Sequence, residues 1–537
     1  MDATSLPQGG SVDGGRTYWF FRNITNGVGG FFSRHKFAMV VTVLSALALA
    51  LLFREEWQPY AVFVRRYFTP MLSAVVISAV AFVATRGSPW WRLGALLVAA
   101  VLIAGAVMTY EYVALWWRYQ SLDVYTLRQL PETTGERVQP LSSVHGLANG
   151  VMGDSKSPTL PAYVWTKDKD GHTEYRWSMG IEPPRTLAFL GQRIFGSIDE
   201  VMLVSGTDAS PNFSAGTRKV RFPVGESLLF SSNTKTAAIR TFDPLMFLSY
   251  EPADVRYIPN DKGEIVQIIS LLRWRGLFVP YPEFGGVLVV HQQEDISPLR
   301  YLARLFVGEG NWIPPEEIDK FPYLRGQNIL PYRVSEYIGE SLRFRNGPFA
   351  PFPGYHQGDL RVPLLPEDQN PMPYAVPFVA QEGLPEMIYH YFALEPYLEG
   401  KHGLVASVLI PADGTHRVFV YDHERHGENL IGVSMVPGIV RDSKKTYNWG
   451  KNVTPVEHRP FIRTVEGKTR FAWLTTVVTY NDILPKKVPK EGDKEETVKR
   501  TMVTGNIPEV VLTDAQTNAT AWVDPRDHAS WAKALPK

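Results

Sequence analysis

Three uncharged apolar stretches lie within the first 117 of the 537 residues, and they constrain the fold more than any other feature of the chain. They run from Phe37 to Phe53, from Tyr67 to Thr85 and from Leu93 to Tyr110. An α-helix rises about 1.5 Å per residue, so about 20 residues cross a hydrocarbon core of about 30 Å. Trp and Tyr residues flank the third stretch, as is typical of bilayer interfaces. The sequence therefore predicts three transmembrane helices within residues 37–117.

Three spans would separate the N-terminal tail, residues 1–36, from the large C-terminal region. Six Lys and Arg residues lie beside the spans on the side of the tail and five on the other side, which favours a cytoplasmic tail by a single charge. The absence of cysteine is compatible with an oxidising compartment. We therefore expect an integral protein of the bacterial cytoplasmic membrane whose C-terminal region lies outside the cytoplasm.

Composition excludes several classes of function. A chain without cysteine cannot form disulfides, thiolate metal sites or a cysteine nucleophile. The formal net charge is +1, and no basic stripe alternates with aromatic residues, so we expect no nucleic-acid partner. The sequence also carries no cofactor-binding signature, and we expect none to be bound.

The remainder of the chain is predicted to be rich in β-strands, with α-helices inserted. Residues 118–160 are polar and contain Gly, Pro and Ser, so we interpret them as a stalk. Residues 161–377 form a first β-rich region, because apolar and polar residues alternate with a period of two from Ala162 to about Gln293. A helical insert is expected next. Its segments are 298–306, a short helix beginning near 314–317, and 332–344.

A proline-rich loop separates this region from a second one. Residues 348–377 contain eight prolines but also several aromatic residues, so we interpret the loop as an ordered segment that wraps around the sheet. Residues 378–537 form the second β-rich region, with a hairpin predicted across Glu466–Gly467–Lys468. The predicted fold class is a membrane-anchored α+β protein.

Two aromatic segments are the candidates for a partner-binding surface. Trp, Tyr, Phe and Arg are enriched at the centres of protein interfaces. In both segments Pro and Gly lie between these residues. The alternative interpretation is an ordinary loop whose aromatic residues pack on its own sheet. The candidates are Arg273, Trp274, Arg275, Phe278 and Tyr281 in the first segment and Phe349, Phe352 and Tyr355 in the second.

Catalytic motifs are incomplete. Gly432-Val433-Ser434-Met435-Val436 departs from the Gly-x-Ser-x-Gly pattern of nucleophilic serines at its last position. His423 and His426 are too close in sequence for the i, i+4 pair of a zinc-protease helix. A looser metal site remains possible, and its candidate ligands are His416, Asp422, His423 and His426. A solvated turn explains the same residues without a metal, so we favour no metal site.

Carboxylate chemistry stays open as an alternative. Glycoside hydrolysis needs two acids at a suitable separation, often beside aromatic rings. The candidate acids are Glu283, Glu309, Glu316 and Glu395, and the candidate aromatic residues are Trp165, Trp177, Trp274, Trp312 and Trp473. A pocket with two carboxylates near a tryptophan would favour this alternative.

The sequence thus favours a noncatalytic subunit or scaffold. In this hypothesis the helices anchor the chain in the lipid bilayer, and the extracytoplasmic β-rich region binds a partner protein in an envelope complex. The alternative hypothesis is a membrane-tethered hydrolase that acts on envelope glycans. The sequence does not predict the oligomeric state.

Overall fold

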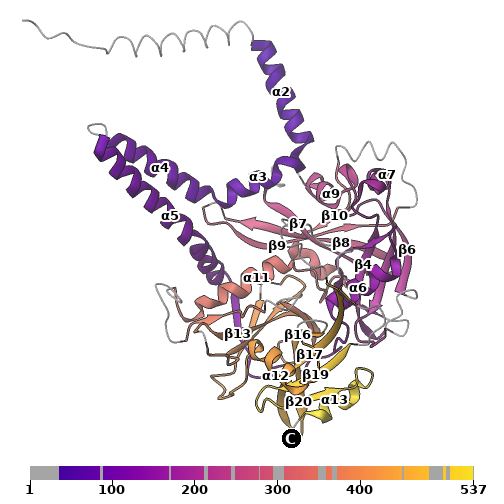
Figure 1. The fold of residues 1–537 in the computed structure, drawn as a ribbon. Coiled ribbons are helices and arrows are strands. Elements are labelled where there is room, and N and C mark those ends of the chain that lie inside the picture. Colours follow the sequence, from indigo (N-terminus) through magenta and orange to yellow (C-terminus); the bar gives the residue numbers. More distant parts are fainter. Residues whose placement is uncertain are drawn as a thin grey trace, which may run out of the picture. The chain divides into compact units, whose positions relative to one another are not determined.

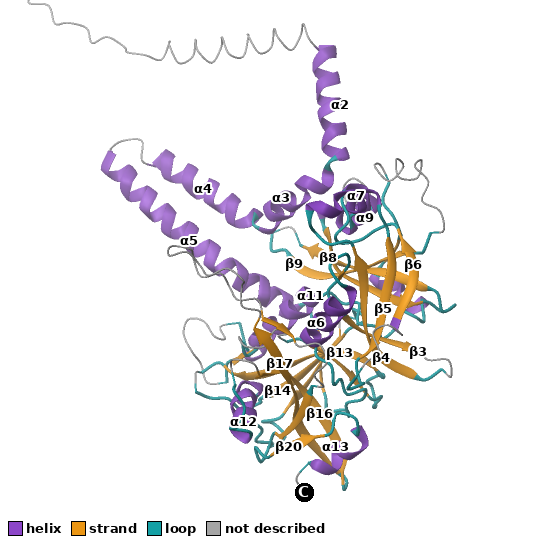
Figure 2. Ribbon diagram, turned by 45° about the vertical axis from the view of Figure 1, so that its right-hand side comes forward, coloured by secondary structure: helices purple, strands orange, loops and turns teal. Residues whose placement is uncertain are grey.

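The structure is a computed structural model, and it separates into two compact units, residues 1–57 and 58–537. The described residues are 36–535 except 85–88, 168–170, 211–215, 243–247, 277, 294–306, 349–357, 366–371, 399, 416, 450–452, 483–499 and 503–507. Helices and β-sheets are mixed throughout the second unit, and the sheets dominate it (Figures 1 and 2). The predicted mixture of helices with a large sheet-rich region is confirmed.

The three apolar stretches are helical, but they do not form three complete spans. They lie in α2 (Lys36–Leu52), α4 (Phe68–Ala84) and α5 (Pro89–Gln120). In the part of the chain that the structure describes, only Leu97–Gln120 is by itself long and apolar enough to cross a membrane. α2 and α4 have 17 residues each, which is short of the roughly 20 needed. The prediction of three spans is corrected to one, or to two if α3 (Arg54–Arg66) and α4 form one bent span.

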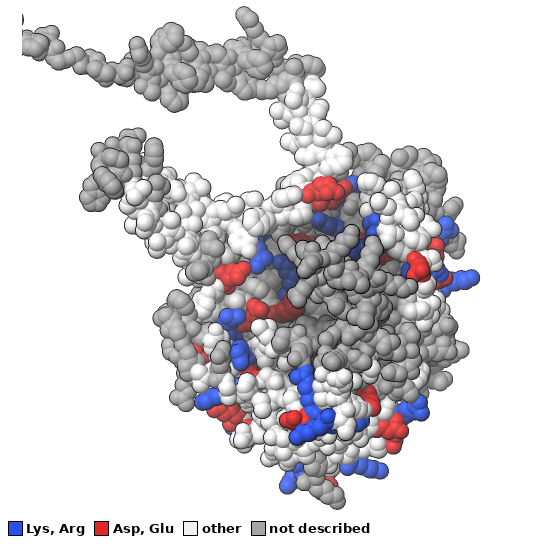
Figure 3. Space-filling model, in the orientation of Figure 1, with Lys and Arg blue, Asp and Glu red and all other residues white. Residues whose placement is uncertain are grey.

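α4 and α5 form an antiparallel hairpin (Figures 1 and 2). At its base the guanidinium of Arg66 lies 3.2 Å from the carboxylate of Glu111, and the rings of Tyr67 and Tyr110 are 6.1 Å apart. Beyond this point α5 continues into the sheet-rich region, where the ring of Tyr112 packs edge-on against Phe344. Figure 3 shows charged side chains of both signs over the sheet-rich region, whereas the described surface of the hairpin is almost uncharged.

One structural pattern occurs four times along the described chain: a short helix followed by a sheet in which most of the paired strands are antiparallel and adjacent in sequence order. The helices are α6 (Leu141–Met152), α9 (Thr234–Thr241), α11 (Tyr332–Ser341) and α12 (Val436–Ser443). Such meanders need only short connections between neighbouring strands. No repeat is recognisable in the sequence, so the repetition is visible only in the fold.

The first and second sheets follow α6 and α9. The first sheet contains β2 (Ser157–Pro158), β3 (Ala162–Lys167), β4 (Thr173–Glu182), β5 (Ile198–Ser205) and β6 (Thr217–Phe222). The second sheet contains β7 (Tyr250–Pro259), β8 (Ile265–Arg275), β9 (Tyr281–Val290) and β10 (Asn311–Ile313). Every residue of β9 is buried, which explains its nearly continuous run of apolar residues.

The third and fourth sheets follow α11 and α12. The third contains β11 (Leu360–Arg361), β12 (Tyr374–Phe378), β13 (Met387–Pro396), β14 (Ala406–Pro411), β15 (Arg417–Asp422) and the parallel strand β1 (Asp123–Thr126). The fourth contains β16 (Val453–Val465), β17 (Lys468–Asp482), β18 (Arg500–Met502), β19 (Glu509–Asp514) and β20 (Thr520–Val523). β16 and β17 form the expected hairpin, and Glu466 and Gly467 in its two-residue turn have φ values of 53° and 77°.

Short helical segments connect these elements. They are η1 (Leu187–Phe189), α7 (Leu190–Phe195), η2 (Phe230–Ser232), η4 (Pro315–Lys320), η5 (Leu342–Asn346), η6 (Val433–Met435) and α13 (His528–Ala534). Part of the expected helical insert is present, because η4 begins at Pro315 and α11 continues into η5. The expected helix at 298–306 lies outside the described residues.

The segment interpreted as a stalk, residues 118–160, lies within the sheet-rich region. It contributes β1 to the third sheet and β2 to the first. Arg137 and Gln139 of this segment are buried, and the carbonyl oxygen of Gln139 accepts a hydrogen bond of 3.0 Å from the indole of Trp177. The polar composition of the segment reflects these buried polar contacts as well as exposed turns.

Candidate functional site

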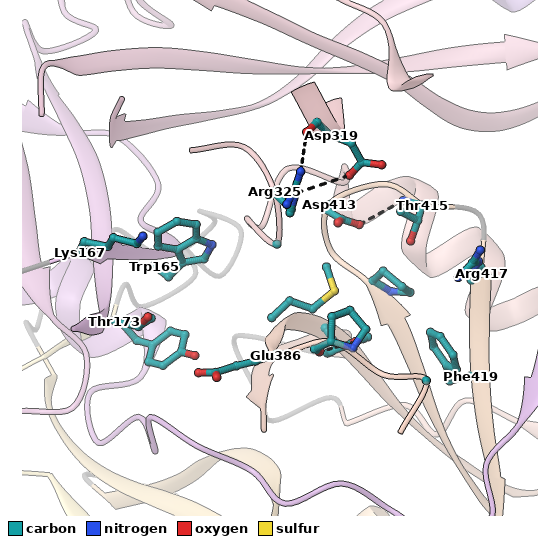
Figure 4. Close-up of a pocket in the computed structure, with 17 residues that line it drawn as sticks. Trp165, Lys167, Thr173, Asp319, Arg325, Glu386, Asp413, Thr415, Arg417 and Phe419 are labelled. Atoms are coloured by element: carbon teal, nitrogen blue, oxygen red, sulfur yellow. Dashed lines mark hydrogen bonds and ion pairs between the residues drawn. The ribbon is translucent and has the colours of Figure 1, made fainter. Parts of the chain in front are cut away.

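A cavity of about 510 Å³ opens between the β3–β4 hairpin and the ends of β13, β14 and β15 (Figure 4). Ligand pockets in proteins have volumes of this order. Four aromatic side chains line it: Trp165 and Tyr175 from the first sheet, and Tyr389 and Phe419 from the third. The cavity therefore depends on contact between the first and third sheets, which are separated in the sequence by the second sheet.

Trp165 forms the wall on the first sheet, and another segment holds its backbone. β3 is an edge strand, because it pairs with β4 on one side only. On its free side the carboxamide of the buried Gln327 accepts a hydrogen bond of 3.3 Å from the N–H of Trp165 and donates one of 2.7 Å to its carbonyl oxygen. Free strand edges attract further strands. The Gln327 amide closes this edge and fixes Trp165 at the cavity.

The opposite wall is built on β13 and β15. The rings of Tyr389 and Phe419 pack edge to face, with centroids 6.3 Å apart. The hydroxyl of Tyr389 donates a hydrogen bond of 2.9 Å to the carbonyl oxygen of Pro385. Between the two walls the chain turns at Gly326, which has a φ of 71°. A Cβ there would lie 3.1 Å from the Cβ of Met387, so both the backbone and the space favour glycine.

Two of the three carboxylates at the cavity are held by neighbouring groups. Asp413 is buried and accepts a hydrogen bond of 3.3 Å from the N–H of Thr415. Burial raises the pKa of its carboxyl, and hydrogen bonds from the backbone of Thr415 and Gly326 oppose this shift. The carboxylate of Asp319 lies 4.0 Å from the guanidinium of Arg325, which also donates a hydrogen bond to the Asp319 carbonyl oxygen (Figure 4).

The third carboxylate, Glu386, is exposed and lies on the side of the cavity opposite Asp319 (Figure 4). Burial raises the pKa of the Tyr175 hydroxyl, and the charge of Glu386 raises it further. Lys167 and Arg417 are exposed at the margins. The site thus combines apolar rings with charges of both signs, an arrangement suited to binding an amphipathic ligand.

The predicted partner-binding residues are divided between exposed and buried positions. Trp274 and Tyr281 are buried at the facing ends of β8 and β9, whereas Arg273, Arg275 and Phe278 are exposed. The connection between the strands contacts α3, because a guanidinium nitrogen of Arg65 donates a hydrogen bond of 3.4 Å to the carbonyl oxygen of Gly276. The second group, Phe349, Phe352 and Tyr355, lies outside the described residues.

The candidate metal ligands have other partners. Asp422 accepts a hydrogen bond of 2.8 Å from Arg345, and His423 lies between Ser407 at 2.9 Å and Glu428 at 2.6 Å. The ring of His426 stacks on Tyr421. His416 lies outside the described residues. Among the residues that the structure describes, no group of three His, Asp or Glu side chains could hold a metal ion.

None of the candidate acids lines the cavity. Glu283 forms an ion pair of 3.0 Å with Arg275, and Glu309 accepts a hydrogen bond from Gln293. Glu316 lies in the first turn of η4. The fourth acid, Glu395, is buried and contacts Ser434.

Glu395 binds the start of η6. Its carboxylate accepts hydrogen bonds from the Ser434 backbone N–H at 2.9 Å and from the Ser434 hydroxyl at 2.6 Å. The Nδ1 of His402 lies 3.0 Å from the same hydroxyl. His402 and Ser434 border a second cavity of about 730 Å³. Because the hydroxyl and the N–H of Ser434 both donate to Glu395, this buried carboxylate connects β13 to the start of η6.

Sequence reasoning named Trp165 only as one of five aromatic candidates and missed the rest of the cavity. Gln327, Glu386 and Asp413 come from three segments separated by tens of residues, and no spacing in the sequence connects them. Comparisons with protein-family models, curated proteins and solved structures found no match for this chain.

Proposed function

We propose that this chain is a noncatalytic, membrane-anchored subunit that binds a partner protein outside the bacterial cytoplasm. The cavity between the first and third sheets would hold an extended peptide segment of that partner. α5, alone or with α4, would anchor the chain in the bilayer. The proposal joins one apolar helix of spanning length to one amphipathic cavity in the sheet-rich region.

The state of the carboxylates is the observation that carries the noncatalytic part of the proposal. Glycoside hydrolysis by carboxylates uses a pair that converges on the scissile bond. Asp413 accepts backbone hydrogen bonds, and Asp319 faces Arg325, so only Glu386 is left for a ligand. Aromatic walls with few polar contacts are typical of grooves that bind extended or proline-containing peptides.

One observation favours the alternative, a hydrolase of envelope glycans. The cavity contains carboxylates near Trp165, which is the composition that such an enzyme needs. In that reading Glu386 would act together with Asp413, whose pKa is raised by burial. The substitution Glu386→Gln keeps the shape of the cavity and removes one charge. It should abolish glycan hydrolysis if the protein is the enzyme, whereas a noncatalytic subunit has no such activity to lose.

The test is purification of the full-length protein from its native membrane in mild detergent. Wild type is compared with Trp165→Ala and with the control Trp522→Ala, which removes a partly exposed tryptophan of the fourth sheet. We expect a stoichiometric partner with wild type and the control, and its loss with Trp165→Ala. Equal recovery of the partner with all three proteins would overturn the assignment of the cavity. Glycan hydrolysis by wild type that Glu386→Gln abolishes would establish the enzyme instead.

A further inference from the structure

α3 has one face packed against the sheet-rich region. Gln58 is 1% exposed and donates a hydrogen bond of 2.7 Å from its side chain to the carbonyl oxygen of Tyr250. One turn later Val62 is buried in the main hydrophobic core. Arg65 then donates a hydrogen bond to the hydroxyl of Ser249. These contacts hold residues 58–66 along the start of β7.

The other face of α3 is apolar and exposed. Tyr60, Phe63 and Val64 are 73%, 54% and 48% exposed, at spacings of three and four residues that place them on one side of the helix. The ring of Phe63 lies 4.8 Å from that of Tyr67, which extends the surface toward α4. Contiguous apolar side chains at a protein surface mark a site of interaction.

The position of α3 in the chain indicates what covers this face. α3 meets α4 at 63°, and α4 packs against α5, the helix that is long enough to span a membrane. If α4 and α5 run across the bilayer, α3 runs at a steep angle to them at the level where they leave it. An amphipathic helix in this orientation lies in the interface with its apolar side toward the acyl chains.

A second element lies at the same level. The hydroxyl of Thr69, in the first turn of α4, donates a hydrogen bond to the carbonyl oxygen of Phe278. The side chain of Phe278 is 59% exposed beside it. Arg275, the last residue of β8, is exposed and forms an ion pair with Glu283. Arg66 is half-buried at the end of α3 and forms an ion pair with Glu111. An exposed aromatic ring at this level is typical of the boundary between headgroups and acyl chains.

We propose that α3 is an interfacial membrane helix. Tyr60, Phe63 and Val64, together with Phe278, insert at the boundary between headgroups and acyl chains. The inner face of the helix meanwhile holds the sheet-rich region at the membrane surface. This inference rests on the membrane anchoring in the proposed function, and it adds a lipid-binding surface in the segment between the first two apolar stretches.

The absence of cysteine makes the test direct, because each single substitution introduces one thiol for labelling. Tyr60→Cys and Phe63→Cys are prepared in the full chain, labelled with an environment-sensitive fluorophore and reconstituted in vesicles of phosphatidylcholine and phosphatidylglycerol. Val76→Cys, at an exposed apolar position of α4, reports on the bilayer. Gln516→Cys, in the exposed turn between β19 and β20, reports on water.

Lipids that carry a quencher near the headgroup should quench labels at residues 60 and 63 severalfold more than lipids with a deep quencher. The label at residue 76 should show the reverse, and aqueous iodide alone should quench the label at residue 516. Iodide quenching at 60 and 63, or protection from both kinds of quencher, would overturn the interfacial helix. If residue 76 also responds to iodide alone, the failure lies in the proposed membrane anchoring itself. Two labelled positions on one face guard against a single variant that misfolds.

Discussion

The junction between the first and fourth sheets and the cavity between the first and third sheets are built from similar side chains, yet they have different properties. At the junction Arg137 donates hydrogen bonds of 3.0 and 2.6 Å to Glu457, whose other oxygen accepts one of 2.7 Å from the N–H of Leu141. The guanidinium lies over the rings of Tyr163 and Trp177, at 4.7 and 4.8 Å. All of these charged groups are buried.

The cavity also combines aromatic rings with carboxylates and guanidinium groups, but water reaches most of them. Asp319, Arg325 and Glu386 are exposed, and the closest ion pair among them spans 4.0 Å. A buried pair that loses one member leaves an uncompensated charge, whereas exposed charges are screened. The comparison teaches that exclusion of water, rather than residue type, separates the structural cluster from the candidate binding site.

The largest effect is expected at the buried junction between the first and fourth sheets. Glu457→Gln leaves Arg137 and Arg459 buried without their counter-charge, so the free energy of unfolding should fall by about 3–5 kcal/mol. Chemical denaturation followed by tryptophan fluorescence measures it. Glu174→Gln, which removes a partly exposed ion pair with Arg176, is the matched control and should change stability by less than about 1 kcal/mol. Equal changes in the free energy of unfolding for the two substitutions would contradict the difference between buried and exposed ion pairs.

The junction should also respond to acid through His458. Burial lowers the pKa of this histidine to about 3, with contributions from Arg441 and Arg459. Below about pH 6.5 the imidazole of His458 is protonated in the unfolded state but stays neutral in the folded state, so the free energy of unfolding falls as the pH falls. At pH 5 the loss attributable to His458 should be roughly 2 kcal/mol.

Comparison of wild type with His458→Gln isolates this contribution. The difference in free energy of unfolding between pH 7 and pH 5 should be smaller in the variant by that amount. His426→Gln, at an exposed histidine, serves as the control. A variant with the same pH dependence as wild type would mean that water reaches His458.

An intermediate effect is expected at the wall of the cavity. Gln327→Ala removes both hydrogen bonds to the backbone of Trp165, which should cost roughly 1–1.5 kcal/mol of stability. It should also weaken partner binding, because the strand edge is no longer held. The control is Gln292→Ala, whose side chain donates to the carbonyl oxygen of Ile265 at an exposed site. Unchanged partner binding would contradict the positioning role of Gln327.

The smallest effect is expected at the margin of the cavity. Asp319→Asn weakens an exposed ion pair with Arg325, and stability should change by less than about 1 kcal/mol. The same denaturation experiment measures it. A loss comparable to that of Glu457→Gln would show that the cavity is as dry as the junction, and the comparison would fail.

Local patterns predicted local structure well. The apolar stretches are helices, and the turn at Glu466–Gly467 forms the expected two-residue hairpin. The number of complete spans was overestimated, because hydropathy records where apolar residues are and not where a helix ends. The chain bends by 63° between α3 and α4, at Tyr67. Pro70 lacks the N–H that would bond to the carbonyl oxygen of Arg66, a break signal that hydropathy alone does not record.

Contacts between distant segments escaped prediction. Arg137 and Glu457 are 320 residues apart, and Trp165 and Gln327 are 162 apart. Arg, Glu and Gln are residue types that are mostly exposed, so nothing in the sequence marks Arg137, Glu457 or Gln327 as buried. Only the packing of the sheets gives Gln327 a strand edge to close and gives Arg137 a buried carboxylate.

The sequence by itself determined the apolar helices, the β-rich character of the C-terminal region and the absence of thiol chemistry, because these depend on residue type and spacing along the chain. The tertiary structure alone decided how many helices reach spanning length, which charges are buried and where the cavity opens. These properties depend on which segments meet and exclude water, and that is fixed by the packing of four sheets and not by any local pattern.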